Sequence, residues 1–188
     1  ITRKDKSKNN KVKNINWLEG KMTDDWSKEL SKCEILIHMA ATGITDNKNN
    51  WEECFSVNVN QPLNLFLKEA NLNIKKIICF GSGFEYGQSA DNFHYIPEDS
   101  ALKPKSAYAA SKAAFSSAAW GLAVENNIKM LILRPFYVYG NVFNKKSLIN
   151  QLIDSYYNNT IMKMGSCKAF RDYVYVDDVV RLFYLILH

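Results

Sequence analysis

Long apolar runs are missing from this chain. No stretch reaches the roughly 18 consecutive apolar residues that a membrane-spanning helix needs, and no secretory leader is visible. The 188 residues are 47% hydrophobic and 23% charged, which is typical of a globular protein with a substantial core. The composition therefore predicts a cytoplasmic protein that has no membrane partner.

Cysteine and histidine are scarce and scattered. The four cysteines and three histidines lie far apart, and no C-x-x-C spacing occurs. Cys33 and Cys79 fall in strand-like apolar runs, where a thiol acts as a small core residue. His38 lies in such a run too, so we expect it to be packed and hydrogen-bonded rather than a ligand. These patterns argue against a metal site or a disulfide framework and favour reduced thiols.

Positive charge exceeds negative charge, and the formal net charge is +5. Much of the excess comes from the first 13 residues, a feature that also occurs in nucleic-acid-binding proteins. In a chain rich in lysine and asparagine, a solvated surface is the simpler explanation. We therefore expect no nucleic-acid partner. The basic residues of this segment are Arg3, Lys4, Lys6, Lys8, Lys11 and Lys13.

Strand-like and helix-like segments alternate along the chain. Continuous apolar strands separated by helices are typical of a parallel sheet covered on both faces, which predicts an α/β fold with a doubly wound, Rossmann-like sheet. The strands are predicted at 14–20, 34–40, 75–81 and 129–135, and the helices at 24–31, 51–72, 105–126 and 146–158.

The glycine-rich turn that normally opens a dinucleotide-binding fold is absent from the sequence. The simplest interpretation is that a first βα unit of about 40 residues is missing, and the C-terminal end is similarly abrupt. We expect residues 1–140 to form a partial dinucleotide-binding domain, and residues 141–188 to begin a smaller substrate-binding region. Without that turn, residues 1–188 alone are expected to bind a dinucleotide poorly.

Tyr108 and Lys112 are the most informative pair in the sequence. They lie four residues apart in SAYAASK, within a predicted helix, and positions i and i+4 share one helix face. A neighbouring positive charge favours the phenolate and lowers the pKa of a tyrosine. The pair therefore predicts a proton donor and acceptor suited to interconverting a carbonyl and an alcohol.

Further motifs occur in a fixed order around this pair. CEILIHMAA, SVNVNQPLNLFLKEA and KKIICFGSGFEYG precede it, and LILRPFYVYG and FRDYVYVDDVV follow it. Together they resemble the extended short-chain dehydrogenase/reductase family over nearly the whole chain. The resemblance implies an NAD(P)-dependent enzyme that modifies a nucleotide-activated sugar, as the epimerases, dehydratases and reductases of this family do.

The resemblance assigns catalytic roles to three residues. Tyr108 matches the tyrosine that exchanges the proton, and Lys112 matches the lysine that lowers its pKa and binds the nicotinamide ribose. Ser82 matches the serine or threonine that hydrogen-bonds the reacting sugar oxygen.

Other positions match the family's binding residues. Asn58 matches an asparagine that braces the active site. Ala40 and Ala41 are small enough for a cofactor to approach the backbone, although Ala41 could equally serve tight helix packing. Pro135 follows the strand that ends near the nicotinamide. Arg171 matches an arginine that grips the nucleotide diphosphate, since its planar fork suits phosphate oxygens.

The sequence departs from the family pattern at three places. Gly83 and Phe84 stand where the 4,6-dehydratases place Asp-Glu, and Glu85 is one residue out of register, so we do not expect dehydration. Tyr137 stands where many epimerases carry asparagine, so its contact with the substrate diphosphate could differ. Lys21 stands where an aspartate commonly contacts adenine.

Arg3 is the only clue to the choice between NAD and NADP. If it ends the second strand, an arginine there accommodates the 2′-phosphate of NADP, which favours a 4-keto-sugar reductase. An NAD-dependent 4-epimerase is the alternative within the enzyme class. A non-catalytic dinucleotide sensor or scaffold is a third reading, although such proteins usually lose the tyrosine or the lysine. The resemblance also implies a homodimer through helices 51–72 and 105–126.

Overall fold

The computed structural model describes residues 14–44, 50–69, 74–140, 147–168 and 170–187. Arg3 therefore lies outside the described residues, and its assignment to NADP stays a prediction. The chain divides into two compact units, Ile1–Leu133 and Arg134–His188. This division falls a few residues before the boundary predicted at residue 140, and the functional roles predicted for the two regions stay predictions.

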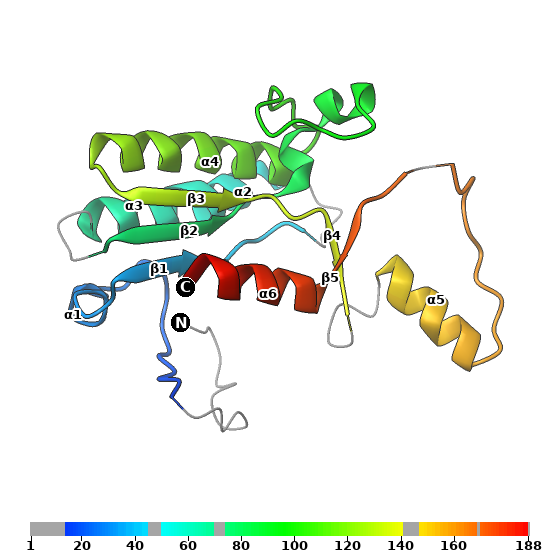
Figure 1. The fold of residues 1–188 in the computed structure, drawn as a ribbon, viewed down its shortest axis with the longest axis horizontal. Coiled ribbons are helices and arrows are strands. Elements are labelled where there is room, and N and C mark those ends of the chain that lie inside the picture. Colours follow the sequence, from blue (N-terminus) through cyan, green and yellow to red (C-terminus); the bar gives the residue numbers. More distant parts are fainter. Residues whose placement is uncertain (1–13, 45–49, 70–73, 141–146, 169, 188) are drawn as a thin grey trace. The chain divides into compact units, whose positions relative to one another are not determined.

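A parallel three-stranded sheet forms the centre of the first unit (Figure 1). Its order is β1 (Ile35–His38), β2 (Lys76–Phe80) and β3 (Lys129–Leu133), with β2 in the middle. In the register of the sheet, Ile78 lies between Ile37 and Leu131. The apolar runs at 34–40, 75–81 and 129–135 thus form strands, and the predicted α/β fold with a parallel sheet is confirmed.

The two long helical segments of this unit both begin at side-chain caps. Asn50 accepts a hydrogen bond from the backbone N–H of Glu53 (3.0 Å) before α2 (Trp51–Phe55). Ser106 accepts one from the backbone N–H of Ala109 (3.2 Å) before α4 (Ala107–Glu125). Such caps satisfy N–H groups that have no partner inside the helix.

The predicted helix at 51–72 is not one regular helix. Its middle, Ser56–Asn60, is a π-helical turn between α2 and α3 (Gln61–Glu69). Turns of this kind occur often at functional sites, because they rotate side chains out of the α-helical register. The apolar pattern of residues 51–72 does not reveal this turn, because the pattern continues through it.

The core of the unit lies where α3 and α4 pack on the sheet. Ile77 and Cys79 point to one face of β2 because side chains alternate along a strand, and both belong to the buried cluster of this unit. Phe66 of α3 and Phe115 of α4 meet in the same cluster with their ring centroids 5.9 Å apart. This packing fixes α4 beside the end of β2.

Two predicted elements differ from the structure. Residues 14–20 form no strand, and only Glu19 takes part in a bridge. A strand requires a continuous ladder to a neighbour, which an apolar pattern alone cannot supply. The helix predicted at 24–31 is a single turn, α1 (Ser27–Leu30).

Gly87 closes the polar loop that precedes α4. It forms a bridge with Lys103 and has a φ of +50°. A Cβ atom at this position would lie 1.8 Å from the carbonyl oxygen of Lys103, so no other residue fits without moving the backbone.

The second unit contains a small parallel sheet of β4 (Tyr137–Tyr139) and β5 (Tyr173–Tyr175). Its helices are α5 (Leu148–Tyr157), which confirms the helix predicted at 146–158, and α6 (Val176–Leu187). Asp177 and Asp178 lie in the first turn of α6. Carboxylates stabilise a helix at this end because they interact favourably with its unpaired N–H groups. Across the described parts of both units, every helix is too short or too polar to cross a membrane.

Candidate active site

Tyr108 and Ser82 come together at the carboxyl end of β2. Tyr108 lies in the first turn of α4, and Ser82 follows the strand by two residues. The Ser82 side chain lies close enough to the Tyr108 phenol to lower its pKa. Ser82 is buried, with 5% of its surface exposed. The two oxygens that the sequence predicts for the reacting centre are therefore neighbours.

A three-residue 3-10 helix, Gly83–Glu85, holds Ser82 in place. The Ser82 hydroxyl accepts a hydrogen bond from the backbone N–H of Phe84 (3.3 Å). In return, the backbone N–H of Ser82 donates to Oε1 of Glu85 (2.8 Å). This reciprocal capping box fixes the backbone at the point where the serine leaves the strand.

Lys112 is almost fully enclosed one turn along α4, with 2% of its surface exposed. Its ammonium donates to the backbone carbonyl of Phe80, the last residue of β2, and lies 5.7 Å from the centroid of the Phe115 ring. Burial lowers the pKa of Lys112, while the nearby Glu85 and Cys79 raise it. A buried cation thus lies at the carboxyl end of the central strand, beside the Ser82 turn.

The pKa of Tyr108 is raised from its ordinary value, chiefly by burial. The Ser82 side chain lowers it, whereas Glu85 and Cys54 raise it further. The net shift is therefore upward, whereas the pairing with Lys112 predicts a lowered pKa. Helical spacing indicates which side chains are neighbours, but it does not indicate how far the phenol is withdrawn from water, and burial outweighs the other effects here.

Asn58 ties the loop after β1 to α4. It lies in the π-helical turn and is 1% exposed. Its Oδ1 accepts from the backbone N–H of Thr42 (2.8 Å), and its Nδ2 donates to the carbonyl oxygen of Thr42 (3.1 Å) and to the Ser111 hydroxyl (2.9 Å). Ser111 in turn donates to the carbonyl oxygen of Tyr108 (2.8 Å). These contacts are those of a bracing residue; a contact with the cofactor stays a prediction.

Ala40 and Ala41 follow β1, and both are exposed. Exposure of Ala41 argues against the alternative of tight helix packing. Gly43, at the end of this segment, has a φ of +90°, and a Cβ atom there would lie 2.6 Å from the sulfur of Cys54. The segment is thus small, open to solvent and braced from behind by Asn58. Such a segment, with the Lys112 cation near the end of the next strand, fits a dinucleotide lying across the sheet edge.

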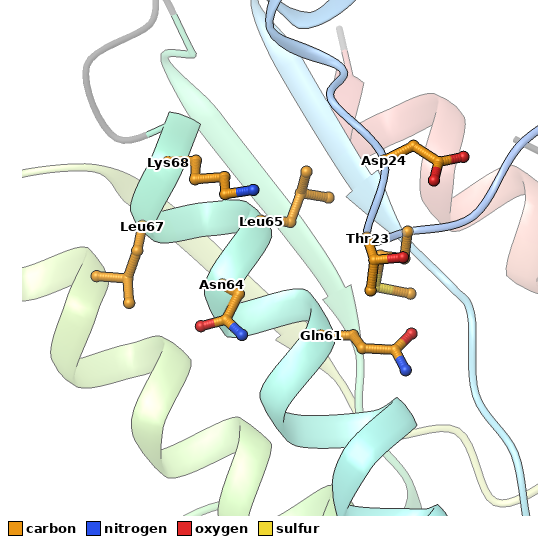
Figure 2. Close-up of a pocket in the computed structure, with 8 residues that line it drawn as sticks. Thr23, Asp24, Gln61, Asn64, Leu65, Leu67 and Lys68 are labelled. Atoms are coloured by element: carbon orange, nitrogen blue, oxygen red, sulfur yellow. The ribbon is translucent and has the colours of Figure 1, made fainter.

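A cavity of about 370 Å³ lies in the same unit, between Thr23–Asp24 and α3 (Figure 2). Met22, Gln61 and Leu65 are among the residues that line it. The Asp24 carboxylate accepts a hydrogen bond from the backbone N–H of Lys21 (2.7 Å). Lys21 occupies the position where the family pattern expects an aspartate. The structure places the carboxylate of Asp24 beside it.

The predicted substrate residues of the second unit also come together. Tyr137 and Arg171 line one cavity of about 590 Å³, and the guanidinium carbon of Arg171 lies 5.6 Å from the centroid of the Tyr137 ring. Lys163, Met162 and Met164 line the same cavity. It therefore combines an aromatic and apolar wall with two cationic side chains. Pro135 belongs to this unit and precedes β4.

Sequence reasoning missed three residues that support the site. Thr42 and Ser111 are the partners of Asn58, and their contacts connect segments far apart in the chain. Glu85 was seen only as a misplaced dehydratase acid, although a serine followed three residues later by glutamate is the signature of a capping box. Among the residues that the structure describes, no cluster of His, Cys, Asp and Glu could hold a metal ion.

Comparisons with known proteins identify relatives of this chain. The family model described as "NAD dependent epimerase/dehydratase family" matches residues 1–188. A dTDP-D-glucose 4,6-dehydratase of Dictyostelium discoideum is 29% identical over 170 residues, covering 85% of this chain and 39% of that protein. A dTDP-4-dehydro-6-deoxyglucose reductase of Escherichia coli is 30% identical over 154 residues, covering 79% of this chain and 48% of that protein.

Solved structures show the same fold. The UDP-glucuronic acid 4-epimerase of Bacillus cereus, in complex with UDP-glucuronic acid and NAD, superposes with a TM-score of 0.80 at 22% identity. The match covers 91% of this chain and 55% of the epimerase. The chain thus spans about half the length of the proteins it matches.

Proposed function

Because the chain belongs to the NAD dependent epimerase/dehydratase family, we propose that the whole protein oxidises or reduces a sugar carbon, C4, of a nucleotide-activated sugar. The proximity of Tyr108 to Ser82, beside the buried Lys112, carries this proposal. The two side chains place a proton donor and a second hydroxyl at one point. Interconversion of a ketone and an alcohol requires such a pair beside the reacting oxygen.

Each residue of the site has a distinct task. NAD(P), when bound, supplies or accepts the hydride at the sugar carbon. In the reductive direction, the Tyr108 phenol gives its proton to the sugar oxygen, which becomes the hydroxyl, and Ser82 donates a hydrogen bond that holds this oxygen. The two side chains need to lie within about 2.6–3.2 Å of that oxygen. Lys112 supplies a positive charge beside the sheet edge and is our candidate for holding the ribose of the cofactor.

We favour a 4-keto-sugar reductase. The raised pKa of Tyr108 keeps its phenol protonated at neutral pH, so the residue is ready to act as an acid. Reduction of a ketone needs an acid at this point, whereas oxidation of an alcohol needs a base. The similarity to the dTDP-4-dehydro-6-deoxyglucose reductase supports the same direction. Arg3 continues to favour NADP as the cofactor.

A 4-epimerase is the second candidate, because the fold of the Bacillus cereus epimerase matches this chain closely. An epimerase oxidises C4 and then returns the hydride to the other face, so it consumes no cofactor. Dehydration is disfavoured. Phe84 stands where the dehydratases carry an acid, and its ring is 47% exposed and meets Tyr108 edge-on with centroids 6.4 Å apart.

The cavity beside Arg171 is our candidate for the nucleotide of the substrate. The Arg171 and Lys163 side chains match the charge of a diphosphate, and the Tyr137 ring and the methionines match the face of a base. Tyr137 offers an aromatic ring and a hydroxyl where many epimerases have an amide, so we expect it to contact the base or the diphosphate differently.

We further infer that the partner in solution is a second copy of the chain, through the two long helical segments. Trp51, Leu67, Trp120 and Val124 lie on these segments and are 55%, 58%, 55% and 67% exposed. Sedimentation of the whole protein tests this, with Trp120→Glu expected to shift a dimer toward monomer. A dimer of unchanged stability in that variant would show that the interface lies elsewhere on the protein.

An assay of the whole protein separates the two enzymatic candidates. A 4-keto-6-deoxy sugar nucleotide is supplied with NADPH or NADH, and the absorbance of the reduced cofactor is followed. In parallel, UDP-glucose is supplied with NAD, and UDP-galactose is measured. Stoichiometric loss of reduced cofactor supports the reductase, and interconversion without net loss supports the epimerase. Failure of both reactions, together with intact dinucleotide binding, would favour the non-catalytic sensor.

A further inference from the structure

Glu85 is a carboxylate that the proposed reaction does not use, yet it is completely enclosed. It ends the short 3-10 helix after β2 and has no exposed surface. Taking a charge out of water is costly unless hydrogen bonds or an opposite charge compensate for it. A buried carboxylate directly beside a reacting centre therefore needs a physical explanation.

Part of the explanation is a backbone contact. Oε1 of Glu85 accepts the N–H of Ser82 at 2.8 Å, and the Ser82 hydroxyl caps the same helix from the other side. The carboxylate thus sets the position of the Ser82 backbone, and with it that of the hydroxyl that acts on Tyr108.

The other part is charge. Glu85 acts electrostatically on both Tyr108 and Lys112, and it raises the pKa of each. The remaining titratable groups that act on this pair are the thiols of Cys54, on α2, and Cys79, on β2. His38, on β1, is affected by Lys112 in turn. Glu85 is the one carboxylate acting on Tyr108 and Lys112 among the described residues.

We propose that Glu85 is a positioning residue of this site: its carboxylate fixes the Ser82 backbone beside Tyr108 and places a negative charge next to Tyr108 and Lys112 inside the protein. The proposal rests on the proposed function, because it assigns Glu85 to that same site. The two tasks can be separated chemically. Glutamine keeps an oxygen that accepts the Ser82 N–H but carries no charge, whereas alanine removes both.

The first test is a titration that needs no substrate. Ultraviolet absorbance of the phenolate is followed against pH in the whole protein and in Glu85→Gln. Each spectrum is corrected with the same protein carrying Tyr108→Phe, which isolates Tyr108 among the ten tyrosines of the chain. Removal of the nearby negative charge is expected to move the Tyr108 transition to lower pH by about one unit. An unchanged transition overturns the electrostatic part of the proposal, whatever reaction the protein catalyses.

The second test compares kcat/KM in the reduction assay. Glu85→Gln is expected to lose about tenfold, and Glu85→Ala about 100-fold, because small displacements of a reacting group have effects of that size. Melting curves show whether Glu85→Ala is folded; if it is not, Glu85→Gln and its pH profile still decide. In Glu85→Gln, the alkaline fall of kcat/KM with pH is expected to shift to lower pH, together with the titration of Tyr108.

Asp91→Asn is the matched control, because Asp91 lies in the neighbouring 3-10 helix and forms an exposed ion pair with Lys105. It is expected to change neither the titration nor the rate. Equal activity of Glu85→Gln and the unchanged protein at every pH overturns the proposal. If the protein reduces no sugar nucleotide, the proposed function fails, while the titration still reports on Glu85.

Discussion

Asn58 bonds both backbone groups of Thr42, its Oδ1 accepting the N–H at 2.8 Å and its Nδ2 donating to the carbonyl oxygen at 3.1 Å. The side-chain amide thereby pairs with the backbone of the loop that leaves β1, as a neighbouring strand would. Because its second donor bond reaches Ser111, this loop and the Tyr108 helix are held by one amide. A change at Asn58 therefore affects both the loop and the helix.

Asn58→Ala is expected to lower the free energy of unfolding by about 2–3 kcal/mol, because the partly buried backbone groups of Thr42 and the buried Ser111 hydroxyl lose their partner. Chemical denaturation of the whole protein measures this. Asn60→Ala is the matched control, because Asn60 lies in the same π-helical turn and is exposed. Equal stability of the two variants would show that the loop finds other partners.

Tyr108→Phe is expected to lower turnover by about 10²- to 10⁴-fold while cofactor affinity changes little, since only the reacting hydroxyl is removed. Calorimetry with NAD(P) and the reduction assay give the two measurements. Tyr95→Phe, at a tyrosine that is 84% exposed, is the control. Full activity of Tyr108→Phe would remove this residue from the mechanism.

The pH dependence of reduction follows from the raised pKa of Tyr108. The phenol is the acid, so its proton is present below the pKa and lost above it. The rate of the step that uses this proton is therefore expected to stay level from about pH 6 to 9 and to fall in the more alkaline range. A rate that declines through neutral pH with a tyrosine-dependent transition would contradict the assignment of the pKa shift to burial.

His38 is expected to make the fold less stable in acid. It is 6% exposed, and burial lowers its pKa from 6.5 to about 4, with Lys112 contributing. Above about pH 6.5 the ring is neutral in both the folded and the unfolded chain, so it has no effect. Between about pH 6.5 and 4 the unfolded chain binds a proton that the folded chain does not, so stability falls by a total of about 3 kcal/mol.

Unfolding measured from pH 7 to 4 tests this expectation, because His38→Leu removes the titrating group and flattens the slope. His94→Leu is the control, since His94 is exposed. Identical slopes for the two variants would mean that His38 does not titrate as expected. His38 is packed as expected, with its ring against Phe66 and Phe115. Its Nε2, however, has no hydrogen-bond partner within the described residues.

Arg171→Lys is expected to raise KM for the nucleotide sugar about tenfold with little change in kcat, because lysine cannot form the two parallel bonds to a phosphate. Steady-state kinetics with the sugar nucleotide measure both constants. Arg181→Lys is the control, because Arg181 forms an exposed ion pair with Asp178 on α6. A loss confined to kcat would place Arg171 at the chemistry rather than in substrate binding.

The sequence predicted the elements that depend on local pattern. The apolar runs became β1, β2 and β3, and the helix predicted at 105–126 became α4. The failures depend on contacts that are distant in the chain. The run 14–20 shows the pattern of a strand but lacks a ladder. The helix predicted at 51–72 is interrupted at Asn58, whose side chain bonds Thr42 and Ser111.

The candidate site shows the same division. Tyr108 and Lys112 were found from their spacing, and Ser82 from the family resemblance. The structure brings all three to the end of β2. The direction of the Tyr108 pKa was wrong, since burial is a property of the folded chain and not of the i, i+4 spacing. Glu85 could have been recognised from its spacing to Ser82.

The π-helical turn at Ser56–Asn60 has a consequence for aligning this chain with its relatives. A π turn contains one residue more than the α-helical turn it replaces. Deleting that residue would rotate the preceding part of the segment by about 100° relative to α3, so Asn58 or its neighbour would face a different direction. A one-residue gap at this point in a related sequence therefore marks a differently supported β1 loop, and not a neutral change in helix length.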